Sequence, residues 1–203
     1  MKAMILKDLL CLKHQAKSVL LVLLVWLVIS VATSNAQFFS ALGILYIVML
    51  PMTTLSYDER ASWDRRALTM PVTRAQVVLS RYVTALLAGL FICAVGAAVI
   101  GVMDGPEHMP LSLGFYLLGV FMLSLGMPLM LWLGVEKARI LVALCYLVPF
   151  LGLLLAEKLG VDVEEALASL SGTRPALIAA VIVLAALALS VLISLGIYRH
   201  KEF

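Results

Sequence analysis

The sequence predicts an all-α integral membrane protein with six transmembrane helices, for three reasons. Hydrophobic residues make up 64% of the 203 residues, charged residues make up 13%, and the mean hydropathy is +1.10. Such a chain is too apolar for an ordinary soluble domain. Stretches without charged residues divide it into six segments of membrane length, and spans of about 20 residues leave room for little besides loops. The third reason is the placement of the basic residues.

Lysine and arginine collect on one side of the predicted bundle. When the spans cross back and forth, 13 of the 15 Lys and Arg residues, all except Lys158 and Arg174, fall on the side of the N-terminus. The acidic residues divide six and six between the two sides, as expected when Lys and Arg set the orientation. Basic loops stay in the cytosol. We therefore predict a multi-pass protein in the lipid bilayer of the bacterial cytoplasmic (inner) membrane, with both termini cytosolic.

The N-terminal part predicts a helix followed by two spans. Residues 1–17 alternate leucines and lysines, with apolar residues on one helical stripe, which is typical of a cytosolic interfacial helix. A plain cytosolic extension of the first span is an open alternative. Residues 18–57 carry no charge and are long enough for spans one and two, with a turn at the polar cluster 34–37.

The other boundaries follow from charges and turn residues. The loop 104–110 is rich in Gly and Pro, and 136–139 is expected to be a short cytosolic turn. The chain is accordingly divided into a loop at 58–75, span three at 76–103, span four at 111–134, span five at 140–156, an outer amphipathic segment at 157–175, span six at 176–197 and a basic tail at 198–203.

The loop 58–75 predicts a short cytosolic helix between spans two and three. Asp58 and Glu59 stand where the start of a helix favours negative charge, and Arg65 and Arg66 stand in later turns where positive charge is favoured. Trp63 is expected to be exposed on this helix. The chemistry leaves two interpretations open: an aromatic binding anchor for a partner, or an interfacial helix with Trp63 among lipid headgroups.

The end of the loop carries its own signals. Pro71 is expected to stop the helix, because proline disfavours helical backbone at the preceding residue. The run Thr73-Arg74-Ala75-Gln76 matches a capping box, in which the first and last residues satisfy each other's backbone N–H groups. We therefore expect span three to begin here.

Several of these segments together resemble the small permeases of ABC type-2 transporters, a group that includes bacterial exporters of peptides, toxins and antibiotics. The resemblance covers the whole chain in layout, and its specific part lies at residues 57–82. It is carried by the six-span order, by Leu6-Lys7-Asp8-Leu9-Leu10, and by the run Tyr57-Asp58-Glu59 … Trp63-Asp64 … Leu68 … Met70-Pro71-Val72-Thr73-Arg74 … Val78-Leu79-Ser80-Arg81-Tyr82.

The resemblance implies a transport subunit driven by a separate protein. In that family the loop at 58–75 is the coupling helix, which docks into a groove on a cytosolic ABC ATPase subunit. ATP and Mg would be bound by that partner, and the permease would pair with itself or with a second permease. The implied cargo is a peptide, toxin, antibiotic or other amphipathic substrate. By this similarity Glu59, Trp63, Asp64, Arg65 and Leu68 would face the ATPase, and Pro71 to Arg74 would hinge the helix onto span three.

Other function classes find little support. The chain has no Gly-Lys pair, so it lacks the P-loop pattern G-x-x-x-x-G-K-[ST] for binding ATP itself. Its three cysteines are isolated and no histidine lies within a predicted span, so no catalytic, cofactor or metal site is expected. Its basic residues lie beside span ends, which does not indicate nucleic-acid binding. The alternatives are a non-transporting scaffold and an ion-coupled secondary transporter or channel without an ATPase, the latter with sodium held near Pro51, Thr53, Thr54 and Ser56.

Overall fold

The long runs without charged residues form long helices. The computed structural model describes residues 2–63, 66, 72–158 and 173–200, and within these every regular element is a helix. This confirms the all-α class. The elements are α1 (Lys2–Ala32), α2 (Gln37–Arg60), α4 (Arg74–Met103), the 3-10 turn η1 (Pro106–His108), α5 (Pro110–Leu133), α6 (Val135–Lys158) and α8 (Thr173–His200).

The chain is an integral membrane protein by the length and composition of these helices. Four described stretches are long and apolar enough to cross a membrane: Phe39–Arg60, Arg74–Met103, Ser112–Leu133 and Leu177–His200. In the most apolar part of the last one only 17% is buried within the protein, so its leucines and isoleucines face outward. Outward apolar faces of this extent suit lipid rather than water. The apolar part of α1, Lys17–Ala32, is shorter, and the six-span count stays a prediction.

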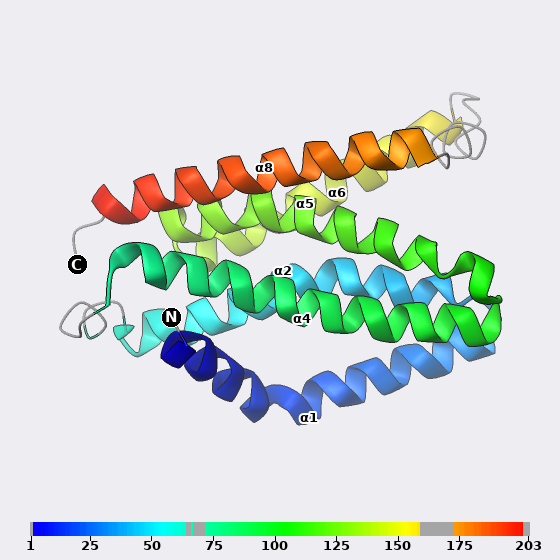
Figure 1. Ribbon diagram of the computed structural model, residues 1–203, viewed down its shortest axis with the longest axis horizontal. Helices are drawn as coiled ribbons and strands as arrows, with labels where there is room; N and C mark the ends of the chain where they lie inside the picture. Colours follow the sequence, from blue (N-terminus) through cyan, green and yellow to red (C-terminus); the bar gives the residue numbers. More distant parts are fainter. Residues whose placement is uncertain (1, 64–65, 67–71, 159–172, 201–203) are drawn as a thin grey trace.

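Three helices form the centre of the bundle and three lie against it (Figure 1). Helices α2, α4 and α5 pack on one another, α1 packs on α2 and α4, α6 packs on α5 and α2, and α8 packs on α5 and α4. The first turn of α1 and the last turn of α8 lie at the same end, on the left in Figure 1. We call this the basic end, because exposed Arg60, Arg66, Lys137, Arg139 and Arg199 lie in segments that meet there.

Glycines bring the three central helices close together. Ile47 of α2 is 1% exposed and lies between Gly89 of α4 and Gly119 of α5. A Cβ atom at Gly89 would lie 2.5 Å from Ile47 Cδ1, and one at Gly119 would lie 2.8 Å from Ile47 Cγ2. Only residues without a side chain leave this space, which is how small residues promote helix packing in membranes.

The boundaries of span three follow the sequence closely. Thr73 has an extended backbone, its hydroxyl accepts the N–H of Gln76, and the Gln76 side chain accepts the N–H of Thr73. The predicted capping box is confirmed. Beyond Met103 the chain turns at Gly105, whose φ of 101° favours glycine, before η1 begins.

Two other boundaries differ from the prediction. Asp58 and Glu59 do not begin a separate helix; they belong to the last turn of α2, which ends at Arg60. Residues 136–139 are not a connecting turn either, because α6 already begins at Val135 and the chain reverses at Gly134, with a φ of 80°. In both cases a contact between distant segments, described below, stabilises the helix end.

Part of the predicted organisation lies outside the described residues. Trp63 and Arg66 are helical, whereas Asp64, Arg65, Leu68 and Pro71 are outside the described part. The same holds for residues 159–172 of the outer amphipathic segment. In Figure 1 α1 bends between its dark-blue first turns and its lighter remainder. That bend is compatible with an interfacial position for residues 1–17, which stays a prediction.

A hydrogen-bonded triad fastens α8 to α4. The Tyr82 hydroxyl lies 2.7 Å from Ser190 Oγ and 2.8 Å from Ser194 Oγ, and all three residues are buried. We expect Tyr82→Phe to lower the free energy of unfolding by about 1–2 kcal/mol, because interhelical hydrogen bonds in membranes contribute about 0.6 kcal/mol on average and up to ~1.7. SDS titration in mixed micelles measures this.

The matched control for that change is Tyr116→Phe. The Tyr116 hydroxyl donates to the Leu86 carbonyl over 3.4 Å, a longer and weaker bond between α5 and α4. Removal of this hydroxyl is expected to lower the free energy of unfolding by less than Tyr82→Phe does. Equal losses in the two variants would contradict a special role for the Tyr82 triad.

Candidate functional site

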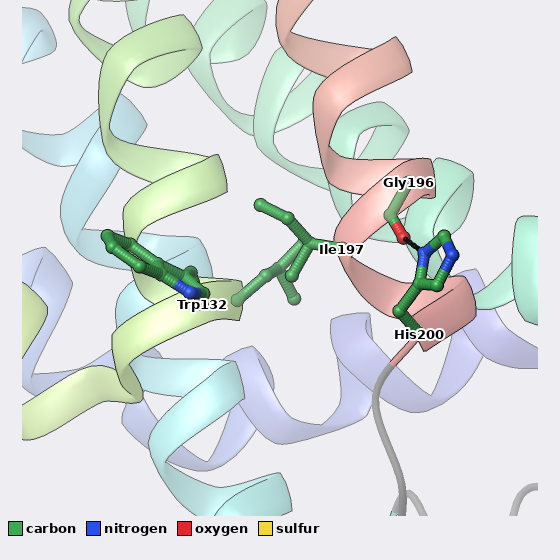
Figure 2. A pocket seen from close by; sticks show the side chains of 5 residues that line it. Trp132, Gly196, Ile197 and His200 are labelled. Carbon is green, nitrogen blue, oxygen red and sulfur yellow. Dashed lines mark hydrogen bonds between the residues drawn. The ribbon is translucent and has the colours of Figure 1, made fainter.

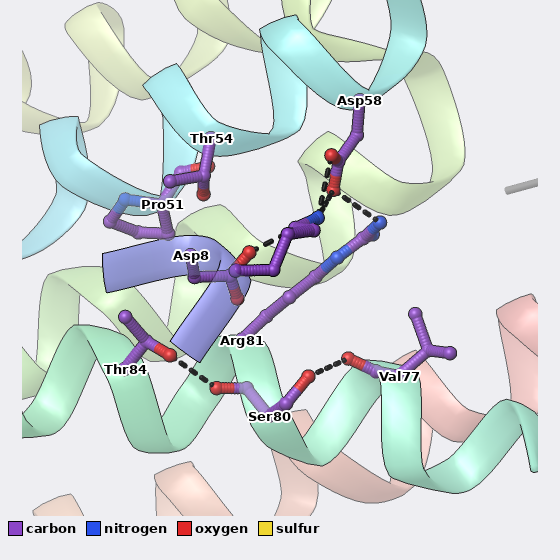
Figure 3. Close-up of polar contacts among 9 residues, drawn as sticks. Asp8, Pro51, Thr54, Asp58, Val77, Ser80, Arg81 and Thr84 are labelled. Carbon is purple, nitrogen blue, oxygen red and sulfur yellow. Dashed lines mark hydrogen bonds and ion pairs between the residues drawn. The ribbon is translucent and has the colours of Figure 1, made fainter. Parts of the chain in front are cut away.

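Four charged side chains meet inside the basic end of the bundle (Figure 3). Lys7 Nζ lies 2.7 and 2.8 Å from the two carboxylate oxygens of Asp58 and 3.1 Å from Asp8. An Arg81 Nη2 atom lies 3.3 Å from the same Asp58 carboxylate. We call Lys7, Asp8, Asp58 and Arg81 the ion cluster. It joins α1, α2 and α4 through one carboxylate.

The ion cluster is buried and formally neutral. The side chains of Asp58 and Arg81 are 7% and 3% exposed, and Lys7 is 23% exposed. Two cations balance two anions, which is the condition for holding ions away from water. The contact also explains why α2 continues through Asp58: an acid in a last helical turn is unfavourable by itself, and here two cations offset that cost.

Aromatic rings cover both cations. Lys7 Nζ lies 4.7 Å from the centre of the Trp63 ring, and the Arg81 guanidinium carbon lies 5.9 Å from the centre of the Tyr198 ring. Both distances are within the range of cation–π attraction. Tyr198 is 1% exposed, so α8 takes part in closing the site.

The hydroxyl groups next to the ion cluster bond within their own helices (Figure 3). Thr54 donates to the carbonyl of Pro51 over 3.0 Å, Ser80 donates to Val77 over 2.9 Å and Thr84 donates to Ser80 over 2.8 Å. These bonds satisfy buried polar groups without involving the ions. The Asp58 carboxylate is held by the two cations instead.

Trp63 points inward, so the expectation that it is exposed is wrong. The side chain is half-buried and packs against the hydrophobic core that also contains Met4 and Tyr198. Polar neighbours in the sequence suggest a solvated position, but Lys7 and the core decide its placement. Its indole connects the loop 58–75 to the first turns of α1.

Two further residues of the expected coupling interface, Glu59 and the hinge residue Arg74, make contacts within the chain. The carboxylate oxygens of Glu59 accept the backbone N–H of Val135 at 3.1 and 3.3 Å, although the residue is exposed. The Arg74 guanidinium donates to the backbone carbonyls of Tyr198 and Arg199 and thereby caps the end of α8. Among the predicted site residues that the structure describes, Trp63 thus contacts the ion cluster, whereas Glu59 binds the start of α6 and Arg74 binds the end of α8.

The ion cluster itself is not predicted from the sequence. Lys7 and Asp8 are recognisable there only as part of a helical opening, and Arg81 only as a charge beside span three. The signal that could have revealed the cluster is that α2 and α4 carry an acid and a base at their basic ends. An acid and a base in facing helices at equal depth favour an ion pair.

An open groove lies at the same end of the bundle (Figure 2). It has a volume of about 470 Å³ and is lined by Leu131 and Trp132 of α5 and by Gly196, Ile197 and His200 of α8. His200 Nδ1 lies 2.9 Å from the Gly196 carbonyl, a bond within α8. The lining is mostly apolar, which suits a packing surface better than a chemical site.

The ionisation of Asp8 gives a testable pH dependence. Burial raises the pKa of its carboxyl above the ordinary value of 3.8, and the neighbouring Lys7 opposes this only in part. In the pH range between the ordinary pKa of the unfolded chain and the raised pKa of the folded protein, the folded protein binds more protons than the unfolded one. Its free energy of unfolding therefore falls as the pH rises through this range.

We therefore expect Asp8→Asn to flatten the acid-side dependence of the melting temperature on pH. Differential scanning fluorimetry in detergent over a pH series measures this slope. An unchanged slope in the variant would contradict the raised pKa of Asp8.

A comparison with known protein families identifies the family of the chain. A family model described as "ABC-2 family transporter protein" matches residues 3–199, which is nearly the whole sequence. Comparisons with curated proteins and with solved structures found no significant match. The match agrees with the resemblance carried by residues 57–82, and proteins of this family generally work with an ABC ATPase.

Proposed function

Because the chain belongs to the ABC-2 transporter family, we propose that it is the permease subunit of an ATP-driven exporter in the bacterial inner membrane. A separate cytosolic ATPase docks on the loop 58–75, which acts as the coupling segment. The permease crosses the membrane six times, with the basic end in the cytosol. It pairs with itself or with a second permease to enclose a path for an amphipathic peptide, toxin or antibiotic.

The observation that carries the proposal is the attachment of the coupling segment to the bundle. Trp63 contacts Lys7 of α1, and Asp58 contacts both Lys7 and Arg81 of α4. A force applied to a loose loop would be lost in loop motion. A segment fixed to α1, α2 and α4 by buried contacts instead passes the displacement to three helices at once.

The exposed charges indicate the partner's chemistry. Asp8 and Asp58 are buried in the ion cluster, and the Glu59 carboxylate is bonded to α6. Among the described exposed residues of the coupling segment, Arg60 and Arg66 carry two positive charges against the single negative charge of Glu59, so this surface is positive overall. The ATPase is accordingly expected to present an acidic groove, since complementary charge favours docking.

Purification from the native host tests the proposal. A tagged chain extracted in gentle detergent is expected to bring down an ATPase that contains a P-loop. Its yield should fall at high salt, because exposed charge pairs are screened. A clean preparation without any ATP-binding protein would overturn the proposal.

An ion-coupled carrier is the alternative, because buried carboxylates inside a membrane bundle often serve ion transport. Asp8 and Asp58 are such groups. However, Lys7 and Arg81 neutralise them, and the hydroxyls of Thr53 and Thr54 already donate to carbonyls of α2. Transport driven by a proton or sodium gradient in liposomes without any ATPase would favour this alternative.

A matched pair of serines tests the orientation. Ser34 and Ser62 are both exposed and have similar backbone conformations, with φ of 51° and 49°, but they lie in turns at opposite ends of α2. In a background with Cys11, Cys93 and Cys145 replaced by serine, Ser34→Cys is expected to react with an impermeant maleimide in intact cells. Ser62→Cys should react only after lysis. The reverse pattern would contradict a cytosolic basic end.

A further inference from the structure

The contact between Glu59 and Val135 joins the last turn of α2 to the first residue of α6. Both carboxylate oxygens of Glu59 lie within 3.3 Å of the Val135 backbone nitrogen. The first N–H groups of a helix have no acceptor within the helix, and they form its positive end. A carboxylate at this place satisfies one of them and lies at the favourable pole of the helix.

The local sequence at the start of α6 cannot supply this cap. The residue before Val135 is Gly134, which has no side chain and a φ of 80°. A Cβ atom at Gly134 would lie 3.4 Å from Glu59 Oε1. Helices usually begin after Ser, Thr, Asp or Asn, whose side chain accepts an N–H of the first turn. Glu59, 76 positions away in the sequence, does so instead.

Adjacent carboxylates at the end of α2 thus hold different partners. Asp58 binds Lys7 of α1 and Arg81 of α4, and Glu59 binds the start of α6. Resting on the proposed function, we propose that Glu59 is a positioning residue that transmits displacement of the coupling segment to α6. Docking would then move two groups of helices from one point: α1 and α4 through Asp58, and α6 through Glu59.

This assignment differs from that of a surface contact with the ATPase. If Glu59 only contacted the ATPase, its loss would weaken ATPase binding. The movement of α6 would then fall in proportion to the amount of ATPase that is still bound. As a positioning residue, its loss leaves the ATPase bound and separates α6 from the coupling segment. The two roles therefore give different readouts.

The test uses the complex of the permease with its ATPase in nanodiscs, with the native cysteines replaced by serine. An environment-sensitive fluorophore is attached either at Ser62→Cys, to report on the coupling segment, or at Arg139→Cys, to report on α6; both residues are exposed. ATP is expected to change the signal of both labels. With Glu59→Ala, the label at position 62 should keep its response and the label at 139 should lose most of it.

Two variants and one independent measurement complete the design. Glu59→Gln keeps an acceptor oxygen for Val135 and is expected to retain the response at position 139. Glu136→Ala, which removes an exposed carboxylate from the first turn of α6, should have no effect. Hydrogen exchange of the Val135 amide should be about tenfold faster in Glu59→Ala, because a hydrogen bond to a charged group is lost.

The outcomes separate the two proposals. A full response at position 139 in Glu59→Ala, with ATPase still bound, overturns the role of Glu59 and leaves the permease function standing. An equal loss at both labels also overturns it, because the variant then acts on docking. If neither label responds to ATP in the unsubstituted complex, the proposed function fails and the inference fails with it.

Discussion

Replacing Asp58 by asparagine is expected to lower the free energy of unfolding by about 3–5 kcal/mol, the largest stability effect we foresee for a single residue. The reason is electrostatic. Asp58 neutralises Lys7 and Arg81, and Arg81 is 3% exposed. Removing one partner of a buried ion pair leaves an uncompensated charge away from water, which costs about this much. SDS titration in mixed micelles measures the change.

Two further variants make this test specific. Glu136→Gln removes a negative charge from an exposed position at the same end and is expected to change stability by less than about 0.5 kcal/mol. The double variant Asp58→Asn with Lys7→Gln removes one charge of each sign and should recover part of the loss, as a double-mutant cycle reveals. If Asp58→Asn lost no more stability than Glu136→Gln, the ion cluster would not stabilise the bundle.

Trp63→Ala is expected to give the largest functional effect, a reduction of at least about tenfold in the ATPase recovered per permease, which corresponds to about 1.4 kcal/mol of binding free energy. The indole fixes the coupling segment to Lys7 and to the core. Without it the segment must be ordered when the ATPase docks, and that ordering lowers the affinity. Quantitative immunoblotting of the purified complex measures the ratio.

Trp132→Ala is the matched control, because Trp132 lies in the last turn of α5 at the same end of the bundle and is 68% exposed. Its removal should leave ATPase recovery unchanged. Trp63→Phe keeps an aromatic face for Lys7 and is expected to restore part of the binding. The comparison is made only if the Trp63→Ala variant is present in the membrane in normal amounts. A normal ratio of ATPase to permease in that variant would show that Trp63 has no part in coupling.

Local features of this fold could be predicted from the sequence because their causes are local. The stretches without charged residues predict the helices, and the capping box predicts the start of α4, since Thr73 and Gln76 are three residues apart and satisfy each other. The turn at Gly105 likewise needs only a residue that tolerates positive φ. Each of these signals is complete within one or two helical turns.

The candidate site could not be predicted in the same way because its causes are distant in sequence. Asp58 lies 51 positions from Lys7 and 23 from Arg81. Seen locally, Asp58 and Glu59 look like acids at the beginning of a helix, which is where the macrodipole favours them. They lie instead at the end of α2, since Lys7, Arg81 and the start of α6 provide the positive charge.

The attachment of α8 has a consequence for biosynthesis. Tyr82 and Arg74 belong to α4, which is synthesised early, yet they bond to Ser190, Ser194 and the last carbonyls of α8, which are synthesised more than a hundred residues later. Until α8 is in place, the Tyr82 hydroxyl lacks both serine partners, and a polar group without a hydrogen bond in the bilayer is costly. A chain that lacks α8 therefore carries this cost, and α4 reaches its final hydrogen bonding only after the last helix has been synthesised.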